Sequence, residues 1–342
     1  MTTPVTVRDP RPAGGGALLS VQDLRVRFAT EDGPVFAVNG VSFDLAAGEI
    51  IALVGESGCG KSVTAMAVPG LLAPTATVTG RILLEGRDLL ELSPKDLRAV
   101  RGKDVSFVFQ EPMTSLNPAF TVGKQIREVL QRHEGLSKKA AQARAVELLQ
   151  LVRIPAPERR VDEYPHQLSG GMRQRVMIAI AVACGPKVLV ADEPTTALDV
   201  TIQAGVLDIL RDLRDELGTS IVLITHDLGV VADLADKVVV MYAGRPVDQA
   251  EVHELFAHPQ HPYTNGLLGA VPHREQGVEL VAGRRLSEIP GLVPALRSDP
   301  DECVFAPRCS RRTEVCTSRR PPLEPVRPAH PAACFHPGKA QL

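Results

Sequence analysis

Residues 55–62 read GESGCGKS and follow directly on the apolar run EIIALV at residues 49–54. The loop matches the pattern G-x-x-x-x-G-K-[ST] in full, and an apolar run bounded by glycine is typical of a buried parallel strand. Glycines let backbone N–H groups approach phosphate oxygens closely, and a helix that begins after the loop adds its positive end. This order of strand, loop and helix predicts a site for nucleotide phosphates and argues against a glycine-rich turn without a ligand.

Two side chains of this loop have separate predicted roles. Lys61 is expected to reach the β- and γ-phosphates of ATP, and the Ser62 hydroxyl is expected to bind Mg²⁺. The residues of the loop predicted to contact the nucleotide are Gly55, Glu56, Ser57, Gly58, Cys59, Gly60, Lys61, Ser62 and Val63.

A second apolar run, VLVADE at residues 188–193, ends in two adjacent carboxylates. Adjacent acids at the end of a strand are usually solvated surface charges. Next to a phosphate loop they favour another interpretation, in which Asp192 holds Mg²⁺ and Glu193 polarises the attacking water as a general base. The pair therefore predicts hydrolysis of the nucleotide rather than binding alone.

Runs of apolar residues along the chain predict an α/β fold with a mostly parallel sheet. Two alternating segments, 19–28 and 35–45, predict antiparallel strands before the phosphate loop. Further buried strands are expected at 105–109, 188–191 and 221–225, with 238–242 as an edge strand, and helices are expected at 138–151 and 202–217.

Composition divides the chain of 342 residues into parts. We expect a disordered tail at 1–18, a nucleotide-binding domain at 19–256 and, inserted in it, a helical subdomain at about 111–174. Beyond residue 256 the sequence becomes rich in Pro, Arg, His and Cys, which predicts a small, loop-rich domain at 257–342. This organisation gives two domains, in line with the length of the chain.

Charge and hydropathy exclude several classes of protein. With 38 basic and 40 acidic side chains and a net charge of −2, the chain lacks the basic excess of a general nucleic-acid binder. Its apolar runs are short of the roughly 20 residues that cross a bilayer, and the N-terminus lacks the apolar core of a secretory signal. We therefore expect the protein in the cytoplasm, without a membrane span.

The segment LSGGMRQR at residues 168–175 resembles the signature sequence of ABC ATPases. Ser169, Gly170 and Gly171 are expected to form a second anion site at a helix N-terminus. The resemblance covers residues 19–256 and implies the P-loop fold of ABC type. It also implies a head-to-tail dimer, in which each ATP lies between the phosphate loop of one subunit and the signature of the other.

The same resemblance assigns roles to further residues. Gln110 is similar to the glutamine that contacts Mg²⁺ and the attacking water, and His226 is similar to the switch histidine at the γ-phosphate. Phe28 resembles the aromatic residue that stacks on adenine, although Phe36 lies nearby and either could belong to the core. The D-loop at the dimer interface would comprise Ala197, Leu198 and Asp199.

Two segments, EPMTSLNPAFTVGKQI at 111–126 and HPQHPYTNGLLGAVP at 258–272, are similar to the peptide and nickel importer branch. This implies an ATP-hydrolysing subunit that powers uptake of di- and oligopeptides from the cytoplasmic face of the membrane. Its partners would be two permease subunits, a second ABC ATPase and an extracytoplasmic solute-binding protein.

Three alternatives stay open beside the peptide importer. Nickel or another solute is not separated by the sequence, because selectivity lies outside the ATPase. A regulatory role of the C-terminal domain is also open. A non-transport ABC ATPase acting on ribosomes or DNA is disfavoured, because the chain has a single signature and no long coiled coil.

Cys303, Cys309, Cys316 and Cys334 lie in the C-terminal part at separations C-x5-C-x6-C-x17-C. Four thiolates suit zinc or an iron–sulfur cluster, and the absence of paired C-x2-C knuckles weakens zinc. The resemblance implies a structural [4Fe-4S] cluster, with Zn²⁺ and unmetallated thiols as the alternatives. Cys59 and Cys184 stand apart from this quartet.

Overall fold

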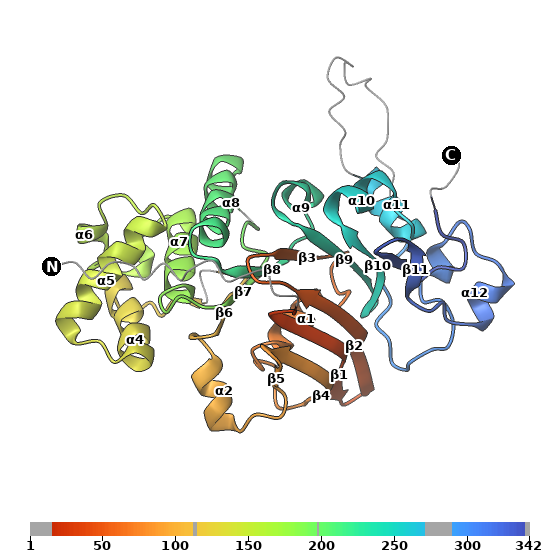
Figure 1. The fold of residues 1–342 in the computed structure, drawn as a ribbon, viewed down its shortest axis with the longest axis horizontal. Coiled ribbons are helices and arrows are strands. Elements are labelled where there is room, and N and C mark those ends of the chain that lie inside the picture. Colours follow the sequence, from red (N-terminus) through yellow and green to blue (C-terminus); the bar gives the residue numbers. More distant parts are fainter. Residues whose placement is uncertain (1–15, 112–114, 197, 271–288, 339–342) are drawn as a thin grey trace, which may run out of the picture.

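The structure, a computed structural model, describes residues 16–111, 115–196, 198–270 and 289–338. The predicted tail at 1–18 therefore lies largely outside the described residues. A central sheet of eight strands has the order β11-β12-β10-β9-β3-β8-β7-β6 (Figure 1). Its parallel strands are β6 (Val105–Val108), β7 (Val188–Asp192), β8 (Ser220–Ile224), β3 (Ile50–Val54) and β9 (Lys237–Tyr242).

The apolar runs form buried strands, as predicted. Every residue of β3, β7 and β8 is buried, because both faces of this part of the sheet are covered. Alternate residues of β3 serve different cores. Ile50, Ala52 and Val54 belong to one hydrophobic cluster with helices α8 (Val200–Asp215) and α9 (Leu228–Leu234), whereas Ile51 and Leu53 belong to a second cluster on the opposite face.

The prediction that residues 238–242 form an edge strand is wrong. Strand β10 (Arg245–Glu251) folds back antiparallel on β9 through a turn at Ala243 and Gly244, both of which have positive φ. As a result β9 lies between β3 and β10 in the sheet. Strand β6 is the edge of the parallel part.

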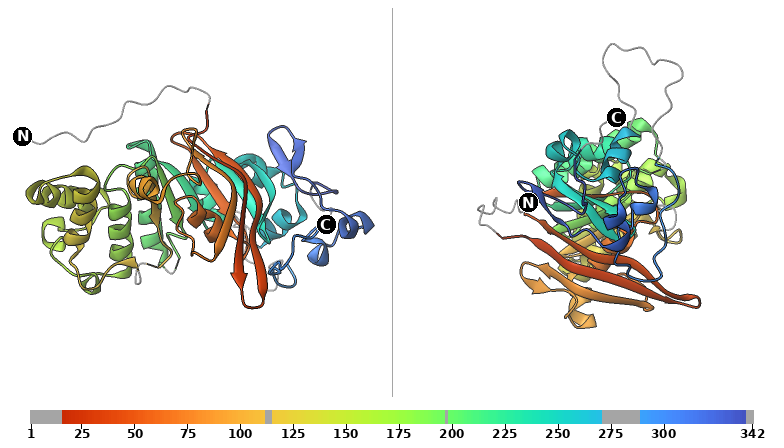
Figure 2. Two further views of the ribbon diagram at one scale, coloured as in Figure 1. Left: turned by 90° about the horizontal axis from the view of Figure 1, so that it is seen from below. Right: turned by 90° about the vertical axis from the view of Figure 1, so that its right-hand side faces the viewer.

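A smaller antiparallel sheet has the order β2-β1-β4-β5 and lies as a separate layer beneath the central sheet (Figure 2). Strands β1 (Leu19–Thr30) and β2 (Gly33–Leu45) confirm the predicted antiparallel pair. Strands β4 (Ala76–Leu84) and β5 (Arg87–Asp88) were not predicted. At Gly80, with φ of 100°, a Cβ atom would collide with the carbonyl oxygen of Asp23, so only glycine fits where β4 passes the irregular part of β1.

Between residues 115 and 174 the described chain forms helices and no strand. These helices gather at one end of the molecule (Figure 1). Side-chain oxygens of Thr121, Ser137 and Ser169 accept a hydrogen bond from the first turn of the helix that each precedes, which fixes the helix starts. The helices are α4 (Val122–Glu134), α5 (Lys138–Leu151), α6 (Pro157–Arg160), the 3₁₀ segment η1 (Pro165–Gln167) and α7 (Gly170–Ala181); α1 (Lys61–Ala67) and α2 (Pro94–Val100) precede them.

The C-terminal region, residues 289–338 as described, lies at the opposite end from these helices (Figure 1). It extends the central sheet, because β12 pairs antiparallel with β10 and carries β11 beside it. The buried His330 Nε2 lies 2.8 Å from Asp248 Oδ1 and joins the two strands. Its elements are η2 (Ala306–Arg308), α12 (Glu314–Ser318), β11 (Glu324–Arg327) and β12 (His330–Ala332), after α10 (Val252–Ala257) and α11 (Pro262–Gly269).

No helix in the described part of the chain is both long enough and apolar enough to cross a membrane.

Candidate active site

The phosphate loop connects β3 to α1 and is packed tightly against neighbouring backbone. A Cβ atom at Gly55 would collide with the carbonyl oxygen of Met241, and one at Gly60 would collide with that of Ala37. Both glycines have positive φ, 147° and 99°. The glycines of the motif are therefore required by close backbone contacts as well as by the turn itself.

Lys61 is buried within this loop, with 6% of its surface exposed. Its Nζ atom donates hydrogen bonds to the carbonyl oxygens of Gly55, at 2.8 Å, and Glu56, at 3.0 Å. These two carbonyl oxygens hold the ammonium group of Lys61 inside the loop. The loop is also where the phosphate oxygens are predicted to bind.

The two side chains predicted to bind Mg²⁺ at the loop and at β7 lie in contact. Ser62 Oγ donates a hydrogen bond of 3.0 Å to Asp192 Oδ1. Burial raises the pKa of Asp192 above its ordinary value, against the opposing effect of the Ser62 hydrogen bond. A hydroxyl and a carboxylate side by side are the hard oxygen ligands that Mg²⁺ prefers, so their chemistry fits this ion.

Glu193 is the centre of the polar side chains beside the loop. Its Oε2 atom accepts hydrogen bonds from Gln110 Nε2 at 2.9 Å and from Thr196 Oγ1 at 2.8 Å, and its Oε1 atom lies 3.2 Å from His226 Nδ1. Burial acts to raise the pKa of Glu193, but the hydrogen bonds from Thr196 and His226 outweigh it, so the pKa is lowered. An ionised carboxylate is the form that accepts a proton from water.

The fold explains why these residues meet. Gln110 follows the strand β6, Glu193 follows β7 and His226 follows β8, and these three parallel strands are neighbours in the sheet. Their carboxyl ends therefore meet at one edge, where ligands bind in open α/β sheets. Thr196 was missed by the sequence analysis; its only signal was its place three residues after the predicted base.

The signature residues begin helix α7. Ser169 Oγ accepts a hydrogen bond from Met172 N at 3.4 Å, which caps the helix. A Cβ atom at Gly170 would meet nothing within 4 Å, whereas one at Gly171 would collide with the side chain of Ile202. One glycine therefore leaves the helix N-terminus open and the other lets α7 pack closely on α8.

The signature and the phosphate loop lie on different parts of the fold. Helix α7 packs mainly on α4, α5, α8 and β6, while α1 packs mainly on β1, β2, β7 and β8. In Figure 1, α7 belongs to the group of helices at one end and α1 lies beneath the central sheet. Hydrogen bonds join Ser62 to Asp192 and, separately, Gln110 and His226 to Glu193. These bonds do not include the signature, where Ser169 caps its own helix.

The remaining predicted contacts are only partly described. Asp199 caps α8 by accepting a hydrogen bond of 2.9 Å from Ile202 N, and Ala197 lies outside the described residues. Phe28 is half-buried on β1, opposite Val35 of β2. Its contact with adenine stays a prediction.

Cys303, Cys309, Cys316 and Cys334 line one small pocket, together with His261, Phe305, Arg311 and His336. Backbone N–H groups of Arg311 and His336 donate to the sulfurs of Cys309, at 3.4 Å, and Cys334, at 3.3 Å. Burial raises the pKa of Cys334 to about 11, so this thiol is protonated at neutral pH.

Four thiols on one pocket suit a metal centre in their chemistry, but not in their present geometry. Within residues 16–111, 115–196, 198–270 and 289–338, no group of three or more His, Cys, Asp or Glu side chains is placed to hold a metal ion. The expected [4Fe-4S] or zinc site is therefore not supported by the arrangement of its ligands.

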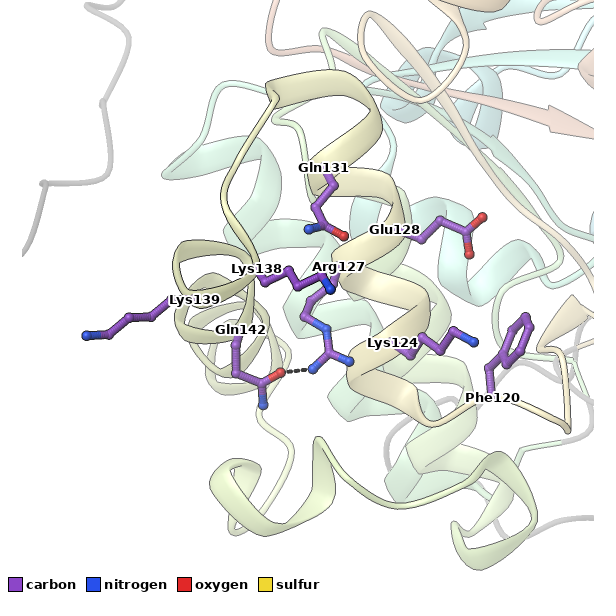
Figure 3. A pocket seen from close by; sticks show the side chains of 8 residues that line it. All are labelled: Phe120, Lys124, Arg127, Glu128, Gln131, Lys138, Lys139 and Gln142. Carbon is purple, nitrogen blue, oxygen red and sulfur yellow. Dashed lines mark hydrogen bonds between the residues drawn. The ribbon is translucent and has the colours of Figure 1, made fainter.

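A larger hollow of about 850 Å³ lies between α4 and α5 (Figure 3). Lys124 Nζ lies 3.4 Å from the centre of the Phe120 ring, and Arg127 donates to Gln142 across the two helices. None of the residues predicted to bind ATP lines this hollow. Size alone thus does not mark the active site in this chain.

Comparison with known proteins agrees with this geometry. Residues 38–196 match the family described as ABC transporter, and residues 247–316 match the one described as oligopeptide/dipeptide transporter, C-terminal region. The dipeptide transport ATP-binding protein DppD of Bacillus subtilis is 54% identical over 87% of this chain and 88% of its own length. The oligopeptide transport ATP-binding protein OppD of Salmonella typhimurium is 49% identical over 96% of both chains.

Among solved structures, a dimeric ATP-binding cassette in a post-hydrolysis state, bound to ADP and Pi, superposes with a TM-score of 0.62. It is 27% identical and covers 68% of this chain and 98% of its own. The phosphate loop, the carboxylates after β7 and the signature before α7 thus occur in a chain that is about half identical to ATP-binding proteins over nearly all its length. The chain belongs to the ABC transporter family, as one of its ATP-binding proteins.

Proposed function

We propose that this chain hydrolyses ATP to power the uptake of di- and oligopeptides across the cytoplasmic membrane. The observation that carries hydrolysis is the ionised carboxylate of Glu193, held by Gln110, Thr196 and His226 directly after the strand that ends in Asp192. Peptides as the solute are supported by the match of residues 247–316 and by the names of the relatives.

The chemistry follows from residues already in contact. The loop N–H groups and Lys61 bind the β- and γ-phosphates, with Lys61 leaving the carbonyls of Gly55 and Glu56. Ser62 and Asp192 would hold Mg²⁺, which would supply positive charge against the phosphates. Glu193 accepts the proton of the attacking water, and Gln110 and His226 orient it.

We further propose that a complete site needs two chains. Ser169, Gly170 and Gly171 of one subunit would bind the γ-phosphate held by the loop of another, with Asp199 at the interface. This is supported by the open N-terminus of α7 and by the likeness to a dimeric cassette. The partner is a second ABC ATPase subunit, and the pair lies at the cytoplasmic face of the membrane beneath two permease subunits. An extracytoplasmic solute-binding protein delivers the solute to these permeases.

The proposed domains and their roles keep the boundaries expected from the sequence. Residues 19–256 bind ATP, with the helical subdomain at about 111–174, and residues 257–342 form the C-terminal domain. Phe28 stacks on the adenine. Nickel or another solute is the alternative cargo.

Uptake of labelled short peptides by the native cells tests this function. Wild type and Glu193→Gln are compared at matched expression, with uptake of labelled Ni²⁺ measured in parallel. We expect the substitution to abolish peptide uptake and to leave Ni²⁺ uptake unchanged. Normal peptide uptake with loss of Ni²⁺ uptake would replace the peptide by nickel, and no effect on either would reject both solutes.

For the pocket of four cysteines we propose a structural [4Fe-4S] cluster in preference to Zn²⁺. Support comes from the chemistry of four thiols on one pocket and from the N–H groups directed at two of the sulfurs. The side chains would have to move together on binding, because no three of them in the described residues are now placed to hold a metal ion. Protein purified without oxygen should contain iron and acid-labile sulfide, which Cys316→Ser removes and Cys184→Ser, outside the pocket, retains. Zinc without iron would favour the alternative ion, and protein without metal would leave free thiols.

A further inference from the structure

The C-terminal region reaches the phosphate loop at its first variable residue, Glu56. Arg308, the last residue of η2, forms a bidentate ion pair with it, with Nη1–Oε2 at 2.9 Å and Nη2–Oε1 at 3.1 Å. The Arg308 side chain is 6% exposed and the Glu56 side chain 28%. Two parallel charge-assisted hydrogen bonds at this burial fix the geometry of the carboxylate.

The backbone of Glu56 is held as well. Its N–H group donates a hydrogen bond of 2.8 Å to Tyr263 Oη. Tyr263, on α11, is fully buried, and its ring packs edge-on against Tyr242 with centroids 4.9 Å apart. Burial raises the pKa of Tyr263, so its hydroxyl stays neutral.

Each polar group of Glu56 has a hydrogen-bond partner. One partner belongs to the phosphate loop motif, and the other two come from the region that follows the nucleotide-binding domain. The carbonyl oxygen of Glu56 accepts from Lys61, which is the residue expected to turn towards phosphate. Its N–H group and its carboxylate are held by Tyr263 and Arg308, which lie outside the nucleotide-binding motifs. The contacts of Tyr263 and Arg308 use other atoms of Glu56 than the hydrogen bond of Lys61 does.

Arg308 also changes the charge that ATP meets. A carboxylate within a phosphate loop repels the phosphates, and the guanidinium of Arg308 offsets this charge at a distance of one hydrogen bond. The guanidinium is itself fixed by the carbonyl oxygens of Ile289, at 2.9 Å, and Pro290, at 2.8 Å.

We propose that Arg308 and Tyr263 are positioning residues for ATP. Acting through Glu56, both hold the start of the phosphate loop in its binding conformation, and Arg308 also neutralises the carboxylate of Glu56. The inference rests on the proposed binding of ATP by this loop. It gives the C-terminal region a role in nucleotide affinity within its own chain.

The test is a double-mutant cycle on nucleotide affinity. The full-length chain is titrated with the fluorescent analogue mant-ATP in the presence of Mg²⁺. Arg308→Ala leaves Glu56 unpaired and is expected to weaken binding about tenfold. Adding Glu56→Gln removes the uncompensated charge, so the double variant should return to within about twofold of Glu56→Gln alone.

A matched control is Arg327→Ala. It removes another arginine–glutamate pair between the C-terminal region and the rest of the chain, with Arg327 Nε 2.7 Å from Glu254 Oε1, away from the loop. The affinity of Arg327→Ala for mant-ATP should equal that of wild type. A merely structural role for Arg308 would weaken the double variant at least as much as the single one, and a general effect of C-terminal docking would appear in Arg327→Ala.

Wild-type affinity in Arg308→Ala, or a double variant that binds more than about twofold more weakly than Glu56→Gln alone, overturns the proposal. If Arg308→Ala does not fold, as judged by circular dichroism, then Tyr263→Phe and Arg308→Lys decide, and wild-type affinity in both overturns it. Failure of the underlying function looks different, because wild type and Lys61→Ala would then bind mant-ATP equally poorly.

Discussion

The phosphate-loop half and the signature half of this chain differ in how far each is assembled. In the first, Ser62 contacts Asp192, and Glu193 is held by Gln110, Thr196 and His226. The residues that would hold the metal and activate water already contact their polar partners. Such preorganised polar groups do not have to reorient during the reaction.

The signature half has a different character. Ser169 caps its own helix, and Gly170 leaves open space at the helix N-terminus. Val200, one residue after Asp199, is 83% exposed although apolar. The phosphate-loop half thus has its polar side chains joined to one another within the chain, whereas the signature half presents an open helix N-terminus to which no side chain of the phosphate loop is hydrogen-bonded in the described residues.

The largest effect is expected from Glu193→Gln, which removes the base from the assembled half. Hydrolysis by the transporter should fall about 100-fold or more, because water activation is lost while the phosphate contacts remain. Phosphate release and mant-ATP binding measure the two effects separately. The control is Glu216→Gln, an exposed carboxylate at the end of α8. Hydrolysis equal to that of the control would show that Glu193 is not the base.

Ser169→Arg breaks the signature half and should lower hydrolysis by about 100-fold, as the loss of one transition-state donor does. The affinity of the isolated chain for mant-ATP should not change, since the loop of the same chain is untouched. Ser169→Thr keeps a hydroxyl cap and serves as the control. Weakened ATP binding in the isolated Ser169→Arg chain would contradict the separation of the two halves.

Lys61→Ala changes the phosphate-loop half and should weaken nucleotide binding itself, which Ser169→Arg leaves unchanged. We expect mant-ATP affinity to fall between about 10- and 100-fold, because a charge-assisted contact to phosphate is lost. Lys95→Ala, an exposed lysine on α2, provides the control for loss of a positive charge. If both variants bind equally well, the loop is not the nucleotide site.

The smallest effect concerns His330, whose contact with Asp248 joins β12 to β10. Burial acts to lower the pKa of His330, but the hydrogen bond and charge of Asp248, with Glu254, outweigh it and raise the pKa. A raised pKa in the folded state means that the stabilisation is complete below about pH 6.5 and is lost as the pH rises through the folded-state pKa.

The melting temperature should therefore fall as the pH rises above about 6.5, and His330→Gln should reduce this fall. His253→Gln, an exposed histidine on α10, should leave it unchanged. Hydrogen exchange should change in β10 and β12 and not in α7. An unchanged pH profile in His330→Gln would exclude His330 as the titrating group.

Much of the fold follows from local sequence. The runs of apolar residues at β3, β7 and β8 predict buried parallel strands, because a strand covered on both faces needs apolar side chains throughout, and every residue in these strands is buried. Strand β10, RPVDQAE, contains proline and charged residues, yet it is largely buried, because Arg245 pairs with Asp299 and Asp248 pairs with His330. Without those distant partners its sequence resembles a loop, which is why β9 was predicted as an edge.

The candidate site divides in the same way. Lys61, Ser62, Asp192 and Glu193 were predicted because each belongs to a motif whose spacing carries its chemistry. The partners of Glu56 were not, since Tyr263 and Arg308 lie 207 and 252 residues away along the chain. Contacts of that range depend on the folded sheet and leave no periodic trace in the sequence.

The claim that a complete ATP site joins two chains is tested most directly by photo-crosslinking at the signature. A benzophenone amino acid replaces the open Gly170 in the transporter purified from native cells, and crosslinked peptides are identified by mass spectrometry. We expect an ATP-dependent crosslink from Gly170 to the phosphate loop of another ATPase chain. A crosslink to residues 55–62 of its own chain, or none that depends on ATP, would contradict it.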